Sequence, residues 1–379
     1  MPISSSSRAL GALLLLLAIV SGAEMLARTV LFPHYRALSP DVVGPNPYFG
    51  TYTRPNLAER RFSPGNFDVV NRTNSYGLRG REQGFEDDLN GIWVSGESNA
   101  FGTALDDDQI LSARLQQRGY HVANLANEGG GPGTQYPVMR KLADLGFRPK
   151  MVVYVMTLND GIQAYGPLDA EPAAVPLPLA HQTLTASIGR LFRIEMIKPM
   201  GLKTTLLRSS ALYCWIKLKA TEAPLVQAWM TRIGAVRDID LVPSGNPDLM
   251  RRDPGPLDPL FDQTADAVAQ MRDLVEGRLG ARFMVVLLPA HHALYPSRFG
   301  KYAAHAGLDR ALYDPDRPIR RLTQALEARH VAWLDSTPAL RAAGDPQLIF
   351  PNDGHFNAKG HAILADLVAA FLPRPEARP

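Results

Sequence analysis

Five short apolar runs, separated by helix-like segments, restrict the fold of this chain more than any other feature. The runs cover residues 91–95, 121–126, 151–156, 283–289 and 331–335, and most of them contain β-branched residues. Short, almost wholly apolar runs are typical of strands that are covered on both faces. Apolar residues with helical spacing occur between these runs or after the last one, at 108–118, 138–145, 265–279, 318–330 and 358–372. This alternation predicts an α/β fold, a three-layer α/β/α sandwich around a five-stranded parallel sheet.

The stretch between the third and fourth runs is far longer than one crossover requires. It extends from residue 157 to residue 282, whereas a strand–helix–strand unit needs only about 30 residues in total. We therefore predict a large insertion over roughly residues 165–262. A lid or docking face for a substrate and a passive cover for a sheet edge both remain open as its role.

The N-terminus has the composition of a leader. Residues 9–23 carry no charge, a length that suits the apolar region of a signal peptide, and Ser-Gly-Ala at 21–23 would form a small-residue cleavage site. The apolar character continues through residues 25–32 with one charge, so a membrane anchor is the alternative interpretation. We predict a signal peptide or membrane anchor over residues 1–31, which places most of the chain outside the cytoplasm.

Composition limits the remaining possibilities. Residues 32–88 are rich in proline, asparagine, arginine and aromatic residues with little periodicity, which predicts an irregular arm. We expect the main domain to follow at 89–372 and a short tail at 373–379. The net charge of +3 is too small to indicate a nucleic-acid partner. A single cysteine, Cys214, excludes an intrachain disulfide and a cysteine-rich metal site, and we expect neither metal nor cofactor.

Polar and glycine-rich segments follow four of the five runs. They are Gly-Glu-Ser-Asn at 96–99, a glycine-rich segment at 127–133, Thr-Leu-Asn-Asp at 157–160 and Asn-Asp-Gly-His at 352–355. The carboxyl ends of parallel strands share one edge of a sheet, and ligands bind at that edge. A hydroxyl, a histidine beside an acid, a glycine-rich loop and an amide side chain are the groups that acyl transfer needs. We therefore expect one site there.

These segments resemble the sequence blocks of the SGNH (GDSL-like) hydrolases, over about residues 71–372 apart from the insertion. Asn-Ser-Tyr-Gly-Leu-Arg-Gly-Arg-Glu at 74–82 also resembles the stretch that precedes the nucleophile strand in bacterial, membrane-anchored members. The resemblance implies a flavodoxin-like sheet. It also implies a chain that faces the periplasm from the inner membrane, or one that is periplasmic or secreted if the leader is cleaved.

The resemblance implies a role for each site residue. Ser98 is the nucleophile, His355 is its base, and Asp353 orients the imidazole and stabilises its charged form. The backbone N–H groups of Ser98 and Gly129 and the side-chain amide of Asn159 form the oxyanion hole.

Three features depart from the family pattern. Glu97 stands where the family has aspartate, Thr157 stands where it has glycine, and one residue rather than two separates the acid from the histidine. The implied function is a serine esterase or deacylase that cleaves an ester of a small molecule or polysaccharide. The alternatives are an O-acyltransferase acting on an exported polysaccharide and a catalytically inactive SGNH-like binding protein.

Overall fold

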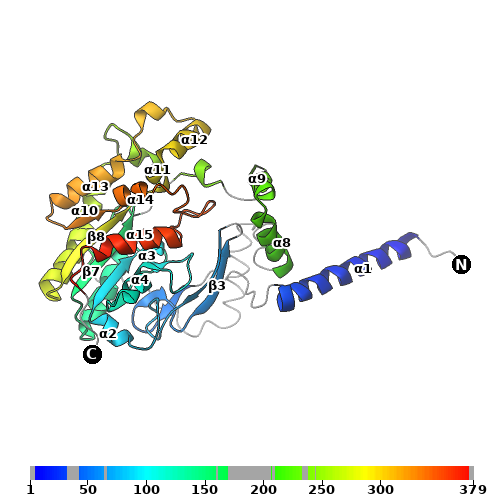
Figure 1. Ribbon diagram of the computed structural model, residues 1–379, viewed down its shortest axis with the longest axis horizontal. Coiled ribbons are helices and arrows are strands. Elements are labelled where there is room, and N and C mark those ends of the chain that lie inside the picture. The colour runs from blue at the N-terminus through cyan, green and yellow to red at the C-terminus, as the bar shows by residue number, and fades with distance from the viewer. Residues whose placement is uncertain are drawn as a thin grey trace. The chain divides into compact units, whose positions relative to one another are not determined.

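The structure, a computed structural model, describes most of the chain. The described residues are 5–31, 42–63, 66–158, 161–169, 206, 210–232, 238–243 and 245–374. The chain divides into two compact units, which Figure 1 shows. The larger unit contains residues 40–61, 66–173 and 237–379, and the smaller contains 1–39, 62–65 and 174–236.

A five-stranded parallel sheet forms the centre of the larger unit. Its strands are β5 (Ile92–Gly96), β6 (Val122–Asn124), β7 (Met151–Thr157), β8 (Arg282–Leu288) and β9 (Trp333–Asp335). Their order is β6-β5-β7-β8-β9, and every neighbouring pair is parallel. This is the flavodoxin-like order, so the structure confirms the predicted fold class. Every residue of β5 and β7 is buried, as their apolar composition predicts.

Helices cover both faces of this sheet because alternate strand residues point to opposite sides. Trp93, Tyr154 and Val285 belong to the core on one face, which the helices α5, α10 and α13 cover. Val94 and Val153 belong to the core on the other face, under α3, α4, α14 and α15. The bounds of these helices are α3 (Ser98–Phe101), α4 (Leu111–Gln117), α5 (Pro132–Asp144), α10 (Pro259–Asp273), α13 (Arg317–Glu327), α14 (Thr337–Ala342) and α15 (Ala358–Ala369).

Shorter elements complete the larger unit. They are α2 (Phe85–Leu89), the 3-10 turns η2 (Ile239–Leu241), η3 (Pro247–Met250) and η5 (Arg310–Leu312), the π-helical turn η4 (Leu274–Arg278), and α11 (His291–Leu294) and α12 (Pro296–Ala306). The stretch from 158 to 281 separates β7 from β8, as the predicted insertion requires. Of this insertion, residues 170–205 lie outside the described part.

Residues 42–63 and 66–88, the described part of the segment 32–88, contain regular structure where the sequence predicts an irregular arm. This part contains two two-stranded sheets, one formed by β1 (Val43–Asn46) and β2 (Gly50–Thr53) and one by β3 (Ala58–Ser63) and β4 (Phe67–Arg72). Arg79 is almost fully buried and donates to Asp107 and to the Leu105 carbonyl at 3.0 and 2.8 Å. Contacts between polar side chains do not produce a hydrophobic periodicity in the sequence. The regular structure of this segment could therefore not be predicted from the spacing of apolar residues.

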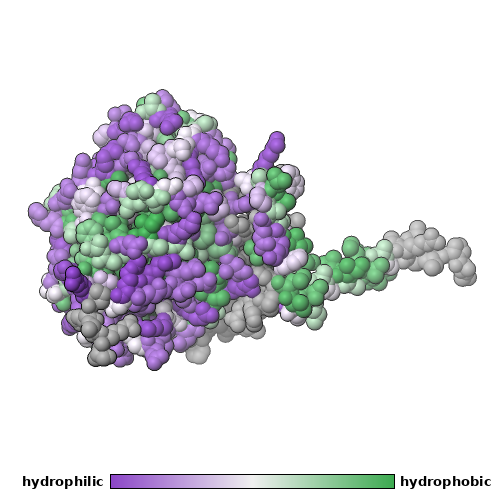
Figure 2. Space-filling view, in the orientation of Figure 1, coloured by the Kyte–Doolittle hydropathy of each residue, from purple (hydrophilic) through white to green (hydrophobic). Residues whose placement is uncertain are grey.

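The described part of the smaller unit is mainly helical. It contains α1 (Ser5–Leu26), which continues as the π-helical turn η1 (Ala27–Leu31), and the helices α8 (Ala211–Glu222) and α9 (Pro224–Arg232). The stretch Leu10–Leu31 is long and apolar enough to cross a membrane, a property that a signal sequence shares. Its leucines are about half exposed, and Figure 2 shows the hydrophobic surface they form.

Candidate active site

The structure brings Ser98, His355 and Asp353 together at the carboxyl edge of the sheet. The distance between Ser98 Oγ and His355 Nε2 is 2.9 Å, although 257 residues separate the two in sequence. The other ring nitrogen, Nδ1, is hydrogen-bonded to Asp353 Oδ1. The same carboxylate oxygen accepts the backbone N–H of His355 at 3.0 Å. One imidazole therefore links a hydroxyl on one side with a carboxylate on the other, the arrangement that activates a serine nucleophile.

A sharp turn at the end of β5 places the serine. Gly96 has a φ of 144°, and a Cβ there would lie 2.2 Å from the carbonyl oxygen of Val155 on the neighbouring strand. Only glycine fits this position, because both the backbone conformation and the close approach exclude a side chain. Glu97 is the N-cap residue, and Ser98 begins helix α3 directly above the sheet.

Asn99, which the sequence analysis did not select, connects three parts of the site. Its Oδ1 accepts the backbone N–H of Phe356 at 3.0 Å, directly after the histidine. Its Nδ2 donates to Thr157 Oγ1 at the end of β7 at 3.2 Å. The threonine that departs from the family pattern is therefore part of a buried hydrogen-bonded connection. The position directly after the nucleophile was the only sequence signal for Asn99.

A tight loop holds the histidine. The backbone N–H of Phe350 donates to the carbonyl of His355 at 3.0 Å, and that of Asp353 donates to the carbonyl of Phe350 at 3.3 Å. Burial lowers the pKa of His355, but the hydrogen bond and the negative charge of Asp353 outweigh it, so the pKa lies above its ordinary value. The charge of Glu128 adds to this increase, and the charge of Arg61 opposes it.

Glu128 is a second acid near the histidine. It accepts a hydrogen bond from Thr103 Oγ1 at 2.6 Å and forms an ion pair with Arg61. Glu128 lies within the glycine-rich segment after β6. Its position at the site follows only from its contacts with Thr103 and Arg61, which are distant in sequence.

The glycine-rich segment needs its glycines for close packing. Gly129, the predicted oxyanion residue, has a φ of 71°. A Cβ on Gly130 would lie 1.7 Å from Oδ1 of Asn127, and a Cβ on Gly131 would lie 2.6 Å from the hydroxyl oxygen of Tyr165.

One buried amide joins this segment to the nucleophile strand. Gln135 is fully buried, and its Nε2 donates to Asn127 Oδ1 at 2.7 Å and to the Gly96 carbonyl at 3.0 Å. Its Oε1 accepts the hydroxyl of Ser95 at 2.7 Å. Because these groups are buried, losing the amide would leave several polar atoms without partners.

We expect Gly130→Ala to lower both the activity and the free energy of unfolding. The added methyl group overlaps the Asn127 side chain, and overpacking of this kind costs about 1–3 kcal/mol. The matched control is Gly133→Ala, where nothing lies within 4 Å of an added Cβ, so no loss is expected. Urea unfolding and ester cleavage measured on both variants test this. Equal stability and activity in the two variants would contradict the proposed packing role of the loop.

Asn159, the third predicted oxyanion residue, lies outside the described residues. Another histidine near the site, His361, is structural, because its Nδ1 accepts the backbone N–H of Leu111 at 3.0 Å. Burial lowers its pKa to about 3, so it stays uncharged at neutral pH. Within the described part of the chain, no group of three or more histidine, cysteine, aspartate or glutamate side chains could hold a metal ion.

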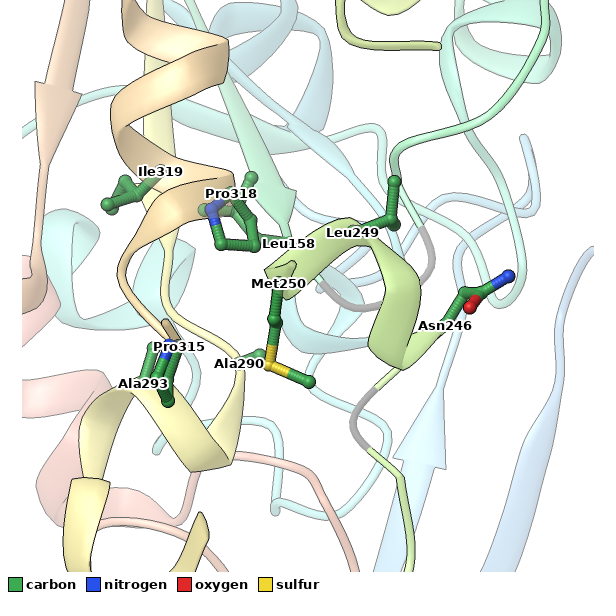
Figure 3. Close-up of a pocket in the computed structure, with 9 residues that line it drawn as sticks. All are labelled: Leu158, Asn246, Leu249, Met250, Ala290, Ala293, Pro315, Pro318 and Ile319. Atoms are coloured by element: carbon green, nitrogen blue, oxygen red, sulfur yellow. The ribbon is translucent and has the colours of Figure 1, made fainter. Parts of the chain in front are cut away.

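A small apolar cavity lies between Leu158, which follows β7, and Ala290, which follows β8. Figure 3 shows the side chains of Met250 and Pro318 lining the same space. Its volume of about 10 Å³ is enough for about one water molecule and too small for an acyl chain.

Comparison with known proteins finds one matching family model and distant likenesses to solved structures. Residues 251–378, which include Asp353 and His355, match a family model described as "SGNH hydrolase-like domain, acetyltransferase AlgX". No curated protein matches the sequence. Two similar solved structures are the crystal structure of TesA and that of LAE5, an α/β hydrolase from the metagenome of Lake Arreo, Spain.

The likeness to both structures is distant. Each is 12% identical to this chain, and the matches cover 74% of it and 96% of TesA or 94% of LAE5, with TM-scores of 0.35 and 0.36. The parallel sheet and the grouping of side chains at its carboxyl edge define a hydrolase-like α/β protein. The family-model match covers residues 251–378, about a third of the chain, and describes an SGNH hydrolase-like domain there.

Proposed function

We propose that this protein is an acyl-transfer enzyme that carries the acyl group on Ser98. The observation that supports this most strongly is the 2.9 Å separation between the Ser98 hydroxyl and an imidazole that Asp353 holds from its other side. His355 accepts the hydroxyl proton while Ser98 Oγ attacks the ester carbonyl. The imidazolium then protonates the departing alcohol, leaving the acyl group on the serine. An acceptor hydroxyl, activated by the same imidazole, removes the acyl group and regenerates the enzyme.

We assign the oxyanion hole to the backbone N–H groups of Ser98 and Gly129 and the side-chain amide of Asn159. The turn at Gly96 and the left-handed backbone at Gly129 support this assignment, because both are conformations that expose backbone N–H groups beside a nucleophile. Each such donor contributes about 3–4 kcal/mol to transition-state stabilisation.

Two overall reactions share this acyl-enzyme. Transfer of a short acyl group to a sugar hydroxyl of an exported polysaccharide is the first candidate, because the matching family model is described as an acetyltransferase. Transfer to water, the esterase or deacylase reaction expected from the sequence, is the second, because the same three side chains suffice for it.

We also propose that α1 anchors the chain in the inner membrane, with the rest of the protein in the periplasm. The exposed apolar surface of the helix supports this proposal. A mass measurement of the mature N-terminus tests it, because cleavage after Ala23 would remove most of α1.

The acceptor decides between the reactions. The purified full chain, incubated with p-nitrophenyl acetate and an acidic or neutral oligosaccharide, is expected to yield an acetylated oligosaccharide that mass spectrometry detects. Release of nitrophenol without acetylated sugar would support the esterase instead. The absence of both products, together with no labelling of Ser98 by a fluorophosphonate, would favour the binding protein and contradict the enzyme.

A further inference from the structure

Helix α9 exposes an apolar face. Its side chains Leu225, Val226 and Trp229 are 86%, 38% and 59% exposed, and no described residue of the helix is buried. Residues 225, 226 and 229 lie on one side of the helix, because positions four apart are neighbours on a helix surface. The adjoining helix α8 adds Ile216, which is 51% exposed. An exposed apolar patch with an aromatic residue at its centre is typical of a surface that another apolar phase covers.

Helix α8 begins at a fixed point on α1. The carboxylate of Glu24 accepts the Ser210 hydroxyl at 2.8 Å and the backbone N–H groups of Ala211 and Leu212 at 2.8 and 3.0 Å. It thereby caps the N-terminus of α8, where unpaired N–H groups favour a negative charge. Arg28 pairs with the same carboxylate at 2.7 Å.

Apolar packing strengthens this junction. Ala27, at the end of the apolar helix, is buried against Ala211 and Cys214 of α8. The position of α8 along α1 is therefore set by both a charged cap and a small packed core.

The charge on Glu24 indicates the depth of α8 relative to a bilayer. Residues 9–23 carry no charge, and Glu24 is the first charged residue after them. A carboxylate with an arginine partner is costly in hydrocarbon and belongs at the membrane–water boundary. Because α8 starts at Glu24, it begins at the level of this boundary, and α9 (Pro224–Arg232) follows it after one residue.

We propose that the face of α9 formed by Leu225, Val226 and Trp229 lies in the interfacial layer of the bilayer that holds α1. This inference rests on the proposed anchoring of α1. Tryptophan is enriched at membrane–water interfaces because its ring is apolar and its N–H polar. Arg232, exposed in the last turn of α9, supplies a positive charge for lipid phosphates. Helix α8 contacts both α9 and α1, and α1 has an exposed apolar surface. Because the lipid that surrounds α1 is therefore close to α9, we infer that lipid and not a second protein covers the apolar face of α9.

Quenching of tryptophan fluorescence by brominated lipid tests this proposal. The full chain is reconstituted into phosphatidylcholine–phosphatidylglycerol vesicles with plain or brominated acyl chains. The chain has four tryptophans, of which Trp93 is fully buried in the larger unit. Because Trp215 lies on α8, the measurement is made in a Trp215→Phe background. Brominated lipid is expected to reduce the emission there, and most of this reduction is expected to disappear when Trp229→Phe is added. The matched control Trp333→Phe, at a half-buried position in β9, is expected to keep it.

A second pair of variants tests the face itself. Leu225→Asp is expected to weaken the quenching of Trp229, because a charge on the face opposes its burial in lipid. Leu145→Asp, at a 44% exposed position of the larger unit, is expected to leave the quenching unchanged.

The outcomes separate the anchor from the interface. A chain that does not float with the vesicles would overturn the anchor and the interface together. If the chain floats with the vesicles, but brominated lipid reduces the emission equally in the parent and in Trp229→Phe, the anchor stands and the interfacial position of α9 is overturned.

Discussion

Replacing Ser98 with alanine is expected to reduce kcat by about a millionfold, the loss typical of removing a serine nucleophile from a hydrogen-bonded triad. Without Ser98 Oγ, no acyl-enzyme can form, and the imidazole 2.9 Å away has no proton to accept. Because the variant still binds the substrate and keeps the oxyanion donors, its residual rate would remain above the rate of the uncatalysed reaction in water. The measurement is p-nitrophenyl acetate turnover, together with labelling by a fluorophosphonate probe.

The control for this prediction is Ser297→Ala, at an exposed serine of α12, which is expected to keep full activity and labelling. Thermal unfolding should show no loss of stability in either variant. Turnover by Ser98→Ala within tenfold of the parent would contradict the role of Ser98 as nucleophile.

Asp353→Asn is expected to lower kcat by about 10⁴-fold, as the corresponding change does in serine proteases. The carboxylate oxygen of Asp353 accepts from the imidazole Nδ1 and from the His355 backbone N–H. An amide in its place favours the wrong tautomer of the ring and cannot stabilise the imidazolium. Asp366→Asn is the control, because Asp366 is 72% exposed on α15 and pairs only with Arg118 among the contacts described. Its activity should equal that of the parent, and a matching loss in both variants would contradict the prediction.

The pH profile gives this variant a second readout. His355 must be neutral to accept a proton, so the activity falls as the pH decreases below its pKa. Burial lowers this pKa, and the hydrogen bond and charge of Asp353 more than reverse that effect. The acidic limb of kcat/KM is therefore expected above the ordinary histidine value in the parent and at lower pH in Asp353→Asn. An unchanged acidic limb in the variant would show that Asp353 does not set the protonation of His355.

The strands were predictable because burial on both faces imposes a local pattern. Residues 151–156 are all hydrophobic and three of the six are valine, and the structure places β7 at Met151–Thr157. The site was predictable to the extent that its residues follow strand ends, as Ser98 does after β5. Gln135 and Glu128 were missed because an amide or acid in a helix or loop has no local signature. Their roles follow only from partners such as Ser95, 40 residues from Gln135.

By itself, the sequence determined the parallel α/β sheet, the apolar N-terminal helix and the segments that meet at the carboxyl edge of the sheet. These properties follow from periodicity and composition, which act over a few neighbouring residues. Only the tertiary structure decided that Ser98 and His355 lie within hydrogen-bond distance, that Asn99 joins their loops, and that Glu24 caps α8. Contacts between residues far apart in the chain depend on how the whole core packs, and no local pattern of side chains records them.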